Sequence, residues 1–506
     1  MDLRFDLKKV DKKITAKLGS PKKGEDRPSE AKAIEILQRI RSLFHYEYIS
    51  AYRDVASERF NASLQNVFEK KLREAFTHNK QAGAPAGYRA LTRAADTIFQ
   101  ESVKQLNPVL NTIVKSVSSA LVHSAAANIK ANKEDLVEWI ASKAALKLET
   151  GEHDEEKVDA VEVGSGLQSS LDLALRRTLI DSSKKVILAI DEPEAFLHPS
   201  AQRRFGRQLL SKDGFEWEKL IITTHSPIIV EEAEYIDIIV ADNQKYYSSS
   251  KEETGRYEIN TAFLRGQGAE MLFGNSILLV EGEGDRLFFE IIRRRLAADS
   301  KEAQLDRAFV VGVGSNTQFA PWIRLLKSFK GASGNTFFNF ICAVDGDSAT
   351  QISESFRKAS IDIDADVRRA FQTVQGHFSS QHRDEWHKTI GALNQLCKER
   401  HVPSRLMVGD LEYAAINKVT SNTLSELYNA LNYTGKKDAH SLMYWLGSKG
   451  MTGNAPSDGN KEPWRRAKMG QVIPLKQLDD SIKSVIRAWF KPFSVGRAIL
   501  NELADV

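Results

Sequence analysis

Carboxylates stand directly after two apolar runs in the middle of the chain, where they could hold metal ions. Glu281 follows the run SILLV and is itself followed by an amphipathic stretch that predicts a helix. Asp345 and Asp347 follow FNFICAV as part of the tripeptide DGD. Such runs predict buried parallel strands, and functional groups of an open α/β sheet gather at the carboxyl ends of its strands. Carboxylate oxygens suit hard divalent cations such as Mg²⁺, and two such ions can activate water for phosphodiester cleavage.

A purely structural interpretation of these acids also exists. An acid after an apolar strand is often only the start of a polar turn, and DGD is a common turn tripeptide. Because both acid sets occur in the same order and frame, the pattern favours a shared metal site over two unrelated turns.

A second set of polar residues, further upstream, indicates phosphate chemistry. Asp191 and Glu192 follow the aliphatic run VILAI, and His225 follows a second aliphatic run in KLIITTHSP. A carboxylate can hold Mg²⁺, and a base can align water against an in-line phosphoryl group. The Asp-Glu-Pro sequence could instead cap a helix with proline in its first turn. That alternative does not predict a strand followed by His-Ser-Pro at this distance.

These upstream motifs resemble an ABC-type ATPase of the DNA-repair and chromosome-maintenance kind. In that family the residue matching Asp191 helps to hold Mg²⁺, the one matching Glu192 polarises the attacking water, and the one matching His225 contacts the terminal phosphate. VEVGSGLQSSLDLAL resembles the family's signature motif, which reaches a nucleotide held by a partner subunit. Its candidate nucleotide-binding residues are Ser165, Gly166 and Gln168.

The phosphate-binding loop that opens this ATPase family, Gly-x4-Gly-Lys followed by Ser or Thr, does not occur in the sequence. Three interpretations are open: an N-terminally truncated product, a lobe that lost hydrolysis and serves as a dimerising scaffold, or a separate polypeptide that supplies the loop. ATP is a further candidate cofactor. We expect the chain alone to hydrolyse ATP weakly or not at all.

Residues 275–420 resemble a Toprim domain, the metal-binding module of topoisomerases, primases and one class of nucleases. An ABC-like lobe followed by a Toprim domain is the order in the OLD-family (overcoming lysogenization defect) endonucleases, including those of bacterial anti-phage systems. This resemblance implies two further metal ligands, Asp285 and Glu412, although Asp410 and Glu412 could also simply cap a helix that runs from Leu411 onward. It also implies a C-terminal lysine that neutralises the scissile phosphate, for which Lys468 is the candidate. No tyrosine stands in the first Toprim motif, so water should be the nucleophile.

Composition agrees with a cytoplasmic enzyme of two or three domains. The 506 residues are 42% hydrophobic, and no apolar run approaches twenty residues, so neither a membrane span nor a signal peptide is expected. Cys342 and Cys397 are the two cysteines, which indicates a reduced compartment without a disulfide. The net charge of +4 does not by itself indicate nucleic acid, and the basic stretches 293–295 and WRRAK are typical of solvated faces.

The predicted fold class is α/β: an incomplete ABC-type ATPase lobe with a helical insertion, then a Toprim domain and a short helical tail. A hairpin is expected in residues 1–20, an acidic surface linker at 149–159, and a flexible loop at 450–460. A crossover helix of the Toprim domain is expected at 317–331, with Trp322 and Leu325 facing the sheet. The predicted parts are N-terminal strands of the lobe (1–56), a helical insertion for dimerisation (57–150), the rest of the lobe (151–270), the Toprim domain (271–425) and a helical region (426–506).

The leading functional hypothesis is a Mg²⁺- or Mn²⁺-dependent DNA endonuclease that is regulated or scaffolded by the ATPase-like lobe and serves anti-phage defence. Its partners would be DNA, a second copy of the chain and a separate polypeptide. The alternative is a non-catalytic assembly or sensor subunit that recruits a partner through the ATPase-like lobe. Converging acids argue against that alternative, because carboxylates repel one another without a metal.

Overall fold

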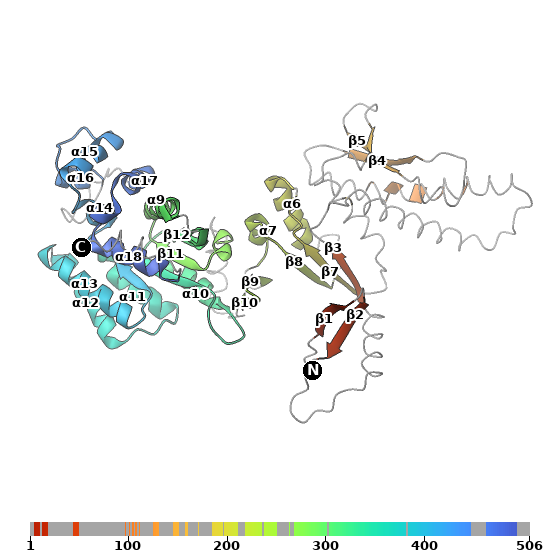
Figure 1. Ribbon diagram of the computed structural model, residues 1–506, viewed down its shortest axis with the longest axis horizontal. Helices are drawn as coiled ribbons and strands as arrows, with labels where there is room; N and C mark the ends of the chain where they lie inside the picture. The colour runs from red at the N-terminus through yellow and green to blue at the C-terminus, as the bar shows by residue number, and fades with distance from the viewer. Residues whose placement is uncertain are drawn as a thin grey trace, which may run out of the picture. The chain divides into compact units, whose positions relative to one another are not determined.

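The computed structural model divides the chain into two compact units, Met1–Glu232 and Ala233–Val506, and each is described here by itself (Figure 1). Between residues 97 and 111 only scattered positions are described, and these are helical. The described residues are otherwise 5–10, 13–18, 44–49, 125–130, 145–150, 157–159, 171, 185–195, 197–210, 218–234, 237–249, 263, 268–300, 303–380, 383–446 and 462–492.

A parallel sheet in the first unit carries the upstream motifs. Its strands are β3 (Phe44–Ile49), β7 (Lys185–Asp191) and β8 (Lys219–Thr223), in the order β3-β7-β8. Three buried residues of β7, Val186, Leu188 and Ile190, form a small core with Leu209 of α6 (Pro199–Leu210). The short helix α7 (Pro227–Glu231) follows β8. The predicted strands before Asp191 and His225 are therefore confirmed.

Antiparallel pairs make up the other strands of the first unit. The predicted N-terminal hairpin is confirmed as β1 (Phe5–Val10) with β2 (Lys13–Leu18). The helical prediction is wrong for β4 (Ala125–Lys130) and β5 (Ala145–Thr150), and the predicted acidic linker contains β6 (Lys157–Asp159).

The sequence carries the reason for that correction. In ALKLET two leucines alternate with Lys and Glu, which is the period of a strand rather than of a helix. The repeats at 62–76 and 109–123, on which the helical prediction was based, lie mostly outside the described residues.

A four-stranded parallel sheet forms the centre of the second unit. It is built from β11 (Ser276–Val280), β12 (Ala308–Gly312), β14 (Asn339–Val344) and β15 (Ser404–Leu406), in the order β12-β11-β14-β15. All five residues of β11 are buried, as expected of a central strand. Because the chain passes from β12 on one side of β11 to β14 on the other, the carboxyl ends of β11 and β14 flank a topological switch point, where ligands bind in such sheets.

Helices surround this sheet, as the sequence predicts for the segments after Val280 and after Leu431. They are α9 (Glu283–Ser300), α10 (Phe319–Ser328), α11 (Ala349–Lys358), α12 (Ala365–Ser380), α13 (Arg383–Glu399), α14 (Leu411–Ile416), α15 (Ser421–Ala430), α16 (Ala439–Trp445), α17 (Pro463–Val472) and α18 (Asp480–Phe490). Trp322 and Leu325 of α10 are buried, in agreement with the predicted crossover helix. The predicted loop at 450–460 lies outside the described residues.

Helix α17 packs closely on α9, although about 180 residues separate them in sequence. A Cβ on Gly470 would lie 3.0 Å from the carbonyl oxygen of Phe288, so a glycine allows this approach. Arg295 of α9 donates to the carbonyl oxygens of Gly470 (2.5 Å) and Ile473 (2.8 Å) at the end of α17. The interpretation of 293–295 as a solvated face is therefore wrong for Arg295, which joins two helices.

A small antiparallel sheet belongs to the second unit: β9 (Ile239–Asp242), β10 (Lys245–Ser249) and β13 (Phe329–Lys330). The predicted division at 270/271 assigns the first two strands to the ATPase-like lobe instead. The structure differs because β10 pairs with β13, and because Arg307 binds Asp242 at 3.0 Å.

Both cysteines, Cys342 in β14 and Cys397 in α13, are buried and free, in agreement with the expected absence of a disulfide. Burial raises the pKa of Cys397 to about 12, so its thiol stays protonated at neutral pH. Among the described helices, none combines the length and apolar character needed to span a bilayer.

Candidate functional site

The acids predicted from the sequence lie at the carboxyl edge of the second unit's parallel sheet. Glu281 directly follows β11, and Asp345 directly follows β14. The backbone N–H of Asp345 donates to Oε1 of Glu281 at 3.3 Å. Asp347 lies in the short 3-10 helix Gly346–Ser348, and Asp285 lies in the first turn of α9. The structure thus brings the two acidic runs together.

Burial and the mutual repulsion of the carboxylates dominate the electrostatics of this edge. Burial raises the pKa of Glu281 to about 7, and repulsion by Asp285 and Asp347 adds to the shift. Burial and the neighbouring acids, Glu281 first, raise the pKa of Asp345 well above its usual range. Oδ1 of Asp345 is buried without a hydrogen-bond partner. A divalent cation binds carboxylate oxygens and would offset the repulsion between these acids. The residues of this edge therefore fit such an ion.

Arg466 is a residue of this site that the sequence interpretation missed. It lies on α17, where its Nε donates to Oε1 of Glu412 at 2.6 Å and its Nη1 donates to Oδ1 of Asp285. The second oxygen of Asp285 accepts the backbone N–H of Gly282 at 3.0 Å. Burial opposes the charge of Arg466, but attraction by Glu412 and Asp285 raises its pKa. The interpretation of WRRAK as a solvated face is therefore wrong here.

The neighbouring Arg465 is also buried, and its guanidinium lies over the ring of Trp445 at 4.1 Å from the centroid. In the structure Arg465 and Met469, which lie about one helical turn apart, are both buried, so α17 turns one face inward. Nothing local marks Arg466, because its partners come from other elements.

The guanidinium of Arg466 divides the acids into two groups. Asp285 and Glu412 are bound to it, whereas no ion pair is recorded between it and Glu281 or Asp345 among the residues that the structure describes. Within the described ranges, no three Asp, Glu, His or Cys side chains are close enough to form a ready-made metal cage. A cation held by Asp285 or Glu412 would therefore compete with Arg466.

The remaining candidates near this site have different surroundings. Asp410 is the N-cap of α14 and accepts the backbone N–H of Tyr413 at 3.0 Å, which confirms its predicted capping role. Glu412 is not explained as a cap, because it binds Arg466. Lys468 is exposed on α17, two positions after Arg466, and the structure records no contact between it and the acids.

The first unit brings Asp191, Glu192 and His225 together at the carboxyl edge of its own sheet. Nε2 of His225 lies 3.6 Å from Oε1 of Glu192. Asp191 accepts hydrogen bonds from Thr223 and, at 3.5 Å, from the hydroxyl of Tyr48. Helix α6 begins at Pro199 rather than at Pro193, so the interpretation of Asp-Glu-Pro as a helix cap is wrong.

Glu192 has a φ of 45°, a left-handed conformation that is unfavourable for a residue with a Cβ. Its backbone N–H donates to the carbonyl oxygen of Thr223 at 2.9 Å, which holds it beside the end of β8. Such strain concentrates at functional positions, where the surrounding structure enforces it. This conformation supports a functional role for Glu192 beyond that of a turn.

Glu194 is a second residue that sequence reasoning missed. Its Oε1 accepts the backbone N–H of His225 at 2.7 Å and so fixes the loop that carries this histidine. Ser226 caps α7 and donates to Oε1 of Gln202 in α6 at 2.6 Å. The signature residues Ser165, Gly166 and Gln168 lie outside the described residues, so their placement stays a prediction.

Two kinds of known protein are similar to this chain: an ATPase domain family and several nucleases. A family model described as an AAA ATPase domain matches residues 2–230, which nearly coincide with the first compact unit, Met1–Glu232. The OLD nuclease of Thermus scotoductus is 30% identical over 139 residues, covering 25% of this chain and 26% of that protein. The Old nuclease of Escherichia phage P2 is 30% identical over 145 residues, covering 25% and 24%.

Endonuclease GajA of Bacillus cereus is 29% identical over 138 residues, covering 26% of this chain and 22% of its own. The chain spans about a quarter of the length of the curated relatives it matches. It is therefore similar to AAA ATPase domains in its first unit and, over a quarter of its length, to nucleases of the OLD type.

Proposed function

We propose that this chain is a divalent-metal-dependent DNA endonuclease of the OLD type that acts in anti-phage defence. Its second unit is a Toprim domain that carries the nuclease site. Its first unit is an ABC-like ATPase lobe that regulates or scaffolds the nuclease. The observation that carries the proposal is the meeting of Glu281 with Asp345 at the switch point of the parallel sheet, where Oδ1 of Asp345 is buried and unpaired. The similarity to curated nucleases supports the same conclusion.

In this proposal Glu281, Asp345 and Asp347 hold Mg²⁺ or Mn²⁺, with Asp285 and Glu412 as additional ligands. The bound ion supplies the acidity that lets water attack a phosphodiester at neutral pH. Water is the nucleophile because no tyrosine follows Glu281 in SILLVEGEGD.

The cations of α17 have separate roles. Arg466 orients Asp285 and Glu412 and offsets part of their charge. Lys468, exposed on the same helix, is the proposed group that neutralises the scissile phosphate.

The test of this proposal uses supercoiled plasmid and the full chain. Nicked or linear product is expected with Mg²⁺ or Mn²⁺, and none is expected with excess chelator. Mn²⁺ should also raise the thermal unfolding midpoint without DNA, because an ion that binds only the native state stabilises it by mass action. Cleavage that continues in chelator would contradict the proposal.

A second candidate function is a non-catalytic assembly or sensor subunit that recruits a partner through the ATPase-like lobe. The absence of a Gly-x4-Gly-Lys phosphate loop from the sequence favours it for the first unit. In either case we propose that the chain forms a homo-oligomer, because signature motifs of the resembled ATPases act across a subunit boundary. The meeting of Glu281 with Asp345, whose buried Oδ1 has no hydrogen-bond partner, favours the nuclease over this alternative.

ATP hydrolysis by the isolated chain should be weak, and Glu192→Gln should change it little. The pair of Glu192 and His225 can act only on a phosphate that is already held, and a phosphate loop normally supplies that hold. Glu231→Gln is the matched control, since the recorded ion pair of Glu231 joins it to the exposed Arg203 at 3.4 Å. Robust turnover that falls about 100-fold in Glu192→Gln, as expected on loss of a general base, would overturn this expectation.

A further inference from the structure

A groove between α13 and α18 lies at the amino-terminal end of β14, whereas the acids lie at its carboxyl end. Its floor is formed by the first residues of β14, Asn339–Ile341, and by Arg405 of β15. Its cavity volume of about 680 Å³ lies in the range of small-molecule sites. Since β14 runs from this floor toward Asp345, its rise of ~3.3 Å per residue places the floor roughly 15–20 Å from the acids.

Arg405 is the unusual residue of this groove. It is only 7% exposed, yet its recorded hydrogen bonds run through Nη1 alone, to the carbonyl oxygens of Ser404 (2.5 Å) and Val402 (3.3 Å). Within the part of the chain that the structure describes, no carboxylate lies within ion-pairing distance of its guanidinium, whereas Arg466 binds two. Burial lowers the pKa of Arg405, but the group stays charged. A buried charge without a counter-ion is costly and calls for a partner.

The other charges of the groove leave a positive surplus. Besides Arg405, the exposed side chains of Lys398 and Lys491 line it. The acids that line it are already engaged: Asp479 lies 3.4 Å from Lys418 and 3.5 Å from His387, and Asp480 lies 2.9 Å from Lys418. A ligand with more than one negative charge would therefore match the groove better than a single carboxylate.

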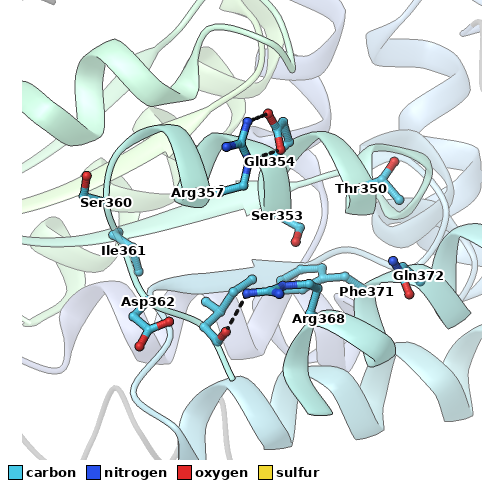
Figure 2. A pocket seen from close by; sticks show the side chains of 11 residues that line it. Thr350, Ser353, Glu354, Arg357, Ser360, Ile361, Asp362, Arg368, Phe371 and Gln372 are labelled. Carbon is cyan, nitrogen blue, oxygen red and sulfur yellow. Dashed lines mark hydrogen bonds and ion pairs between the residues drawn. The ribbon is translucent and has the colours of Figure 1, made fainter. Parts of the chain in front are cut away.

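The second described cavity, of about 510 Å³ between α11 and α12, lacks this combination (Figure 2). There Arg357 forms a two-point ion pair with Glu354, and Arg368 donates to the carbonyl oxygen of Ile363 at 3.2 Å. Both arginines are exposed. Of these two cavities among the described residues, the α13–α18 groove is the one that presents a buried guanidinium without a counter-ion.

We propose that the groove between α13 and α18 binds a phosphate-bearing small molecule, whose phosphate pairs with the Nε and Nη2 edge of Arg405. This edge carries no recorded hydrogen bond, and its two parallel donors match the spacing of two phosphate oxygens. Lys398 and Lys491, at the rim of the groove, would bind the oxygens of a second phosphate group. The site is independent of the proposed nuclease chemistry at Asp345.

The test uses the full chain, metal-free buffer and inorganic pyrophosphate as the probe, with citrate and ionic-strength-matched sodium chloride as parallel arms. Pyrophosphate should raise the thermal unfolding midpoint more than either, and calorimetry should give saturable binding. Arg405→Gln should weaken this binding at least about tenfold, since it removes a charge-assisted hydrogen bond. Arg357→Gln, which removes the same charge from the other cavity, should bind as the wild type does.

A second variant guards against misfolding of Arg405→Gln, which also loses its bonds to Val402 and Ser404. Lys398→Gln changes an exposed residue of the rim and should weaken pyrophosphate binding about two- to fivefold without changing the midpoint in the absence of ligand. Wild-type binding by both variants, or no stabilisation beyond sodium chloride, would overturn the proposal. A larger effect of citrate than of pyrophosphate would overturn the assignment of phosphate.

Discussion

Asp345→Asn is expected to reduce metal-dependent plasmid cleavage at least about 100-fold. Loss of a residue that only orients a metal ligand already lowers activity by up to about 100-fold, and loss of the ligand itself should lower it at least as much. Asn keeps the volume of Asp345 but cannot carry the negative charge that faces Glu281, and one of its two terminal atoms is an NH₂ group that cannot bind a cation. The measurement is the rate at which supercoiled plasmid disappears in Mn²⁺.

The matched control is Asp366→Asn, because Asp366 is an exposed acid of α12 whose ion pair with Arg369 spans 3.8 Å. It should cleave within a factor of about two of wild type, since exposed pairs contribute little. The variant at Asp345 should also lose the Mn²⁺-induced rise in unfolding midpoint. Equal cleavage by both variants would indicate a contaminating nuclease and would remove the support for the site.

Arg466→Met is expected to destabilise the metal-free protein by roughly 3–5 kcal/mol, the range for removing one partner of a buried ion pair. The reason is that Asp285 and Glu412 are both buried, so without the guanidinium each must either remain as an unpaired buried charge or take up a proton. Burial already raises the pKa of Glu412 to about 7, and Arg466 is the group that opposes this shift. Urea unfolding midpoints in metal-free buffer measure the loss.

Arg294→Ala is the control for Arg466→Met. Arg294 is 69% exposed and binds Glu290 at 2.8 Å, so its removal should cost no more than about 0.5 kcal/mol. If a cation can take the place of the guanidinium, Mg²⁺ should stabilise Arg466→Met more than it stabilises wild type. A loss below about 1 kcal/mol would show that Asp285 and Glu412 are solvated rather than held by this arginine.

The sequence by itself determined the elements that end in acids. The runs before Glu281, Asp345 and Asp191 are short, aliphatic and followed by polar residues, so strand type and strand end are local properties. The carboxyl-edge rule for parallel sheets then placed the acids near one another, and the hydrogen bond between Asp345 and Glu281 agrees with it. Helix α9 and the cap at Asp410 followed from local patterns in the same way.

Only the tertiary structure decided which cation meets the acids. Arg466 lies 54 residues from Glu412 and 181 residues from Asp285 in sequence, and no periodicity joins such distant positions. The close packing of α17 on α9 brings them together. A basic stretch on an amphipathic helix looks the same in sequence whether it faces water or a buried acid, so WRRAK could not be interpreted correctly from its letters.

The same reason applies to Arg405 and Glu194. Burial of Arg405 without a carboxylate, and the bond from His225 to Glu194, depend on which loops a fold places side by side. The strand order β12-β11-β14-β15 is likewise a long-range property, because each parallel pairing joins segments separated by a crossover. The sequence therefore determined the local elements and the acids at their ends, whereas long-range packing decided the counter-charges around them.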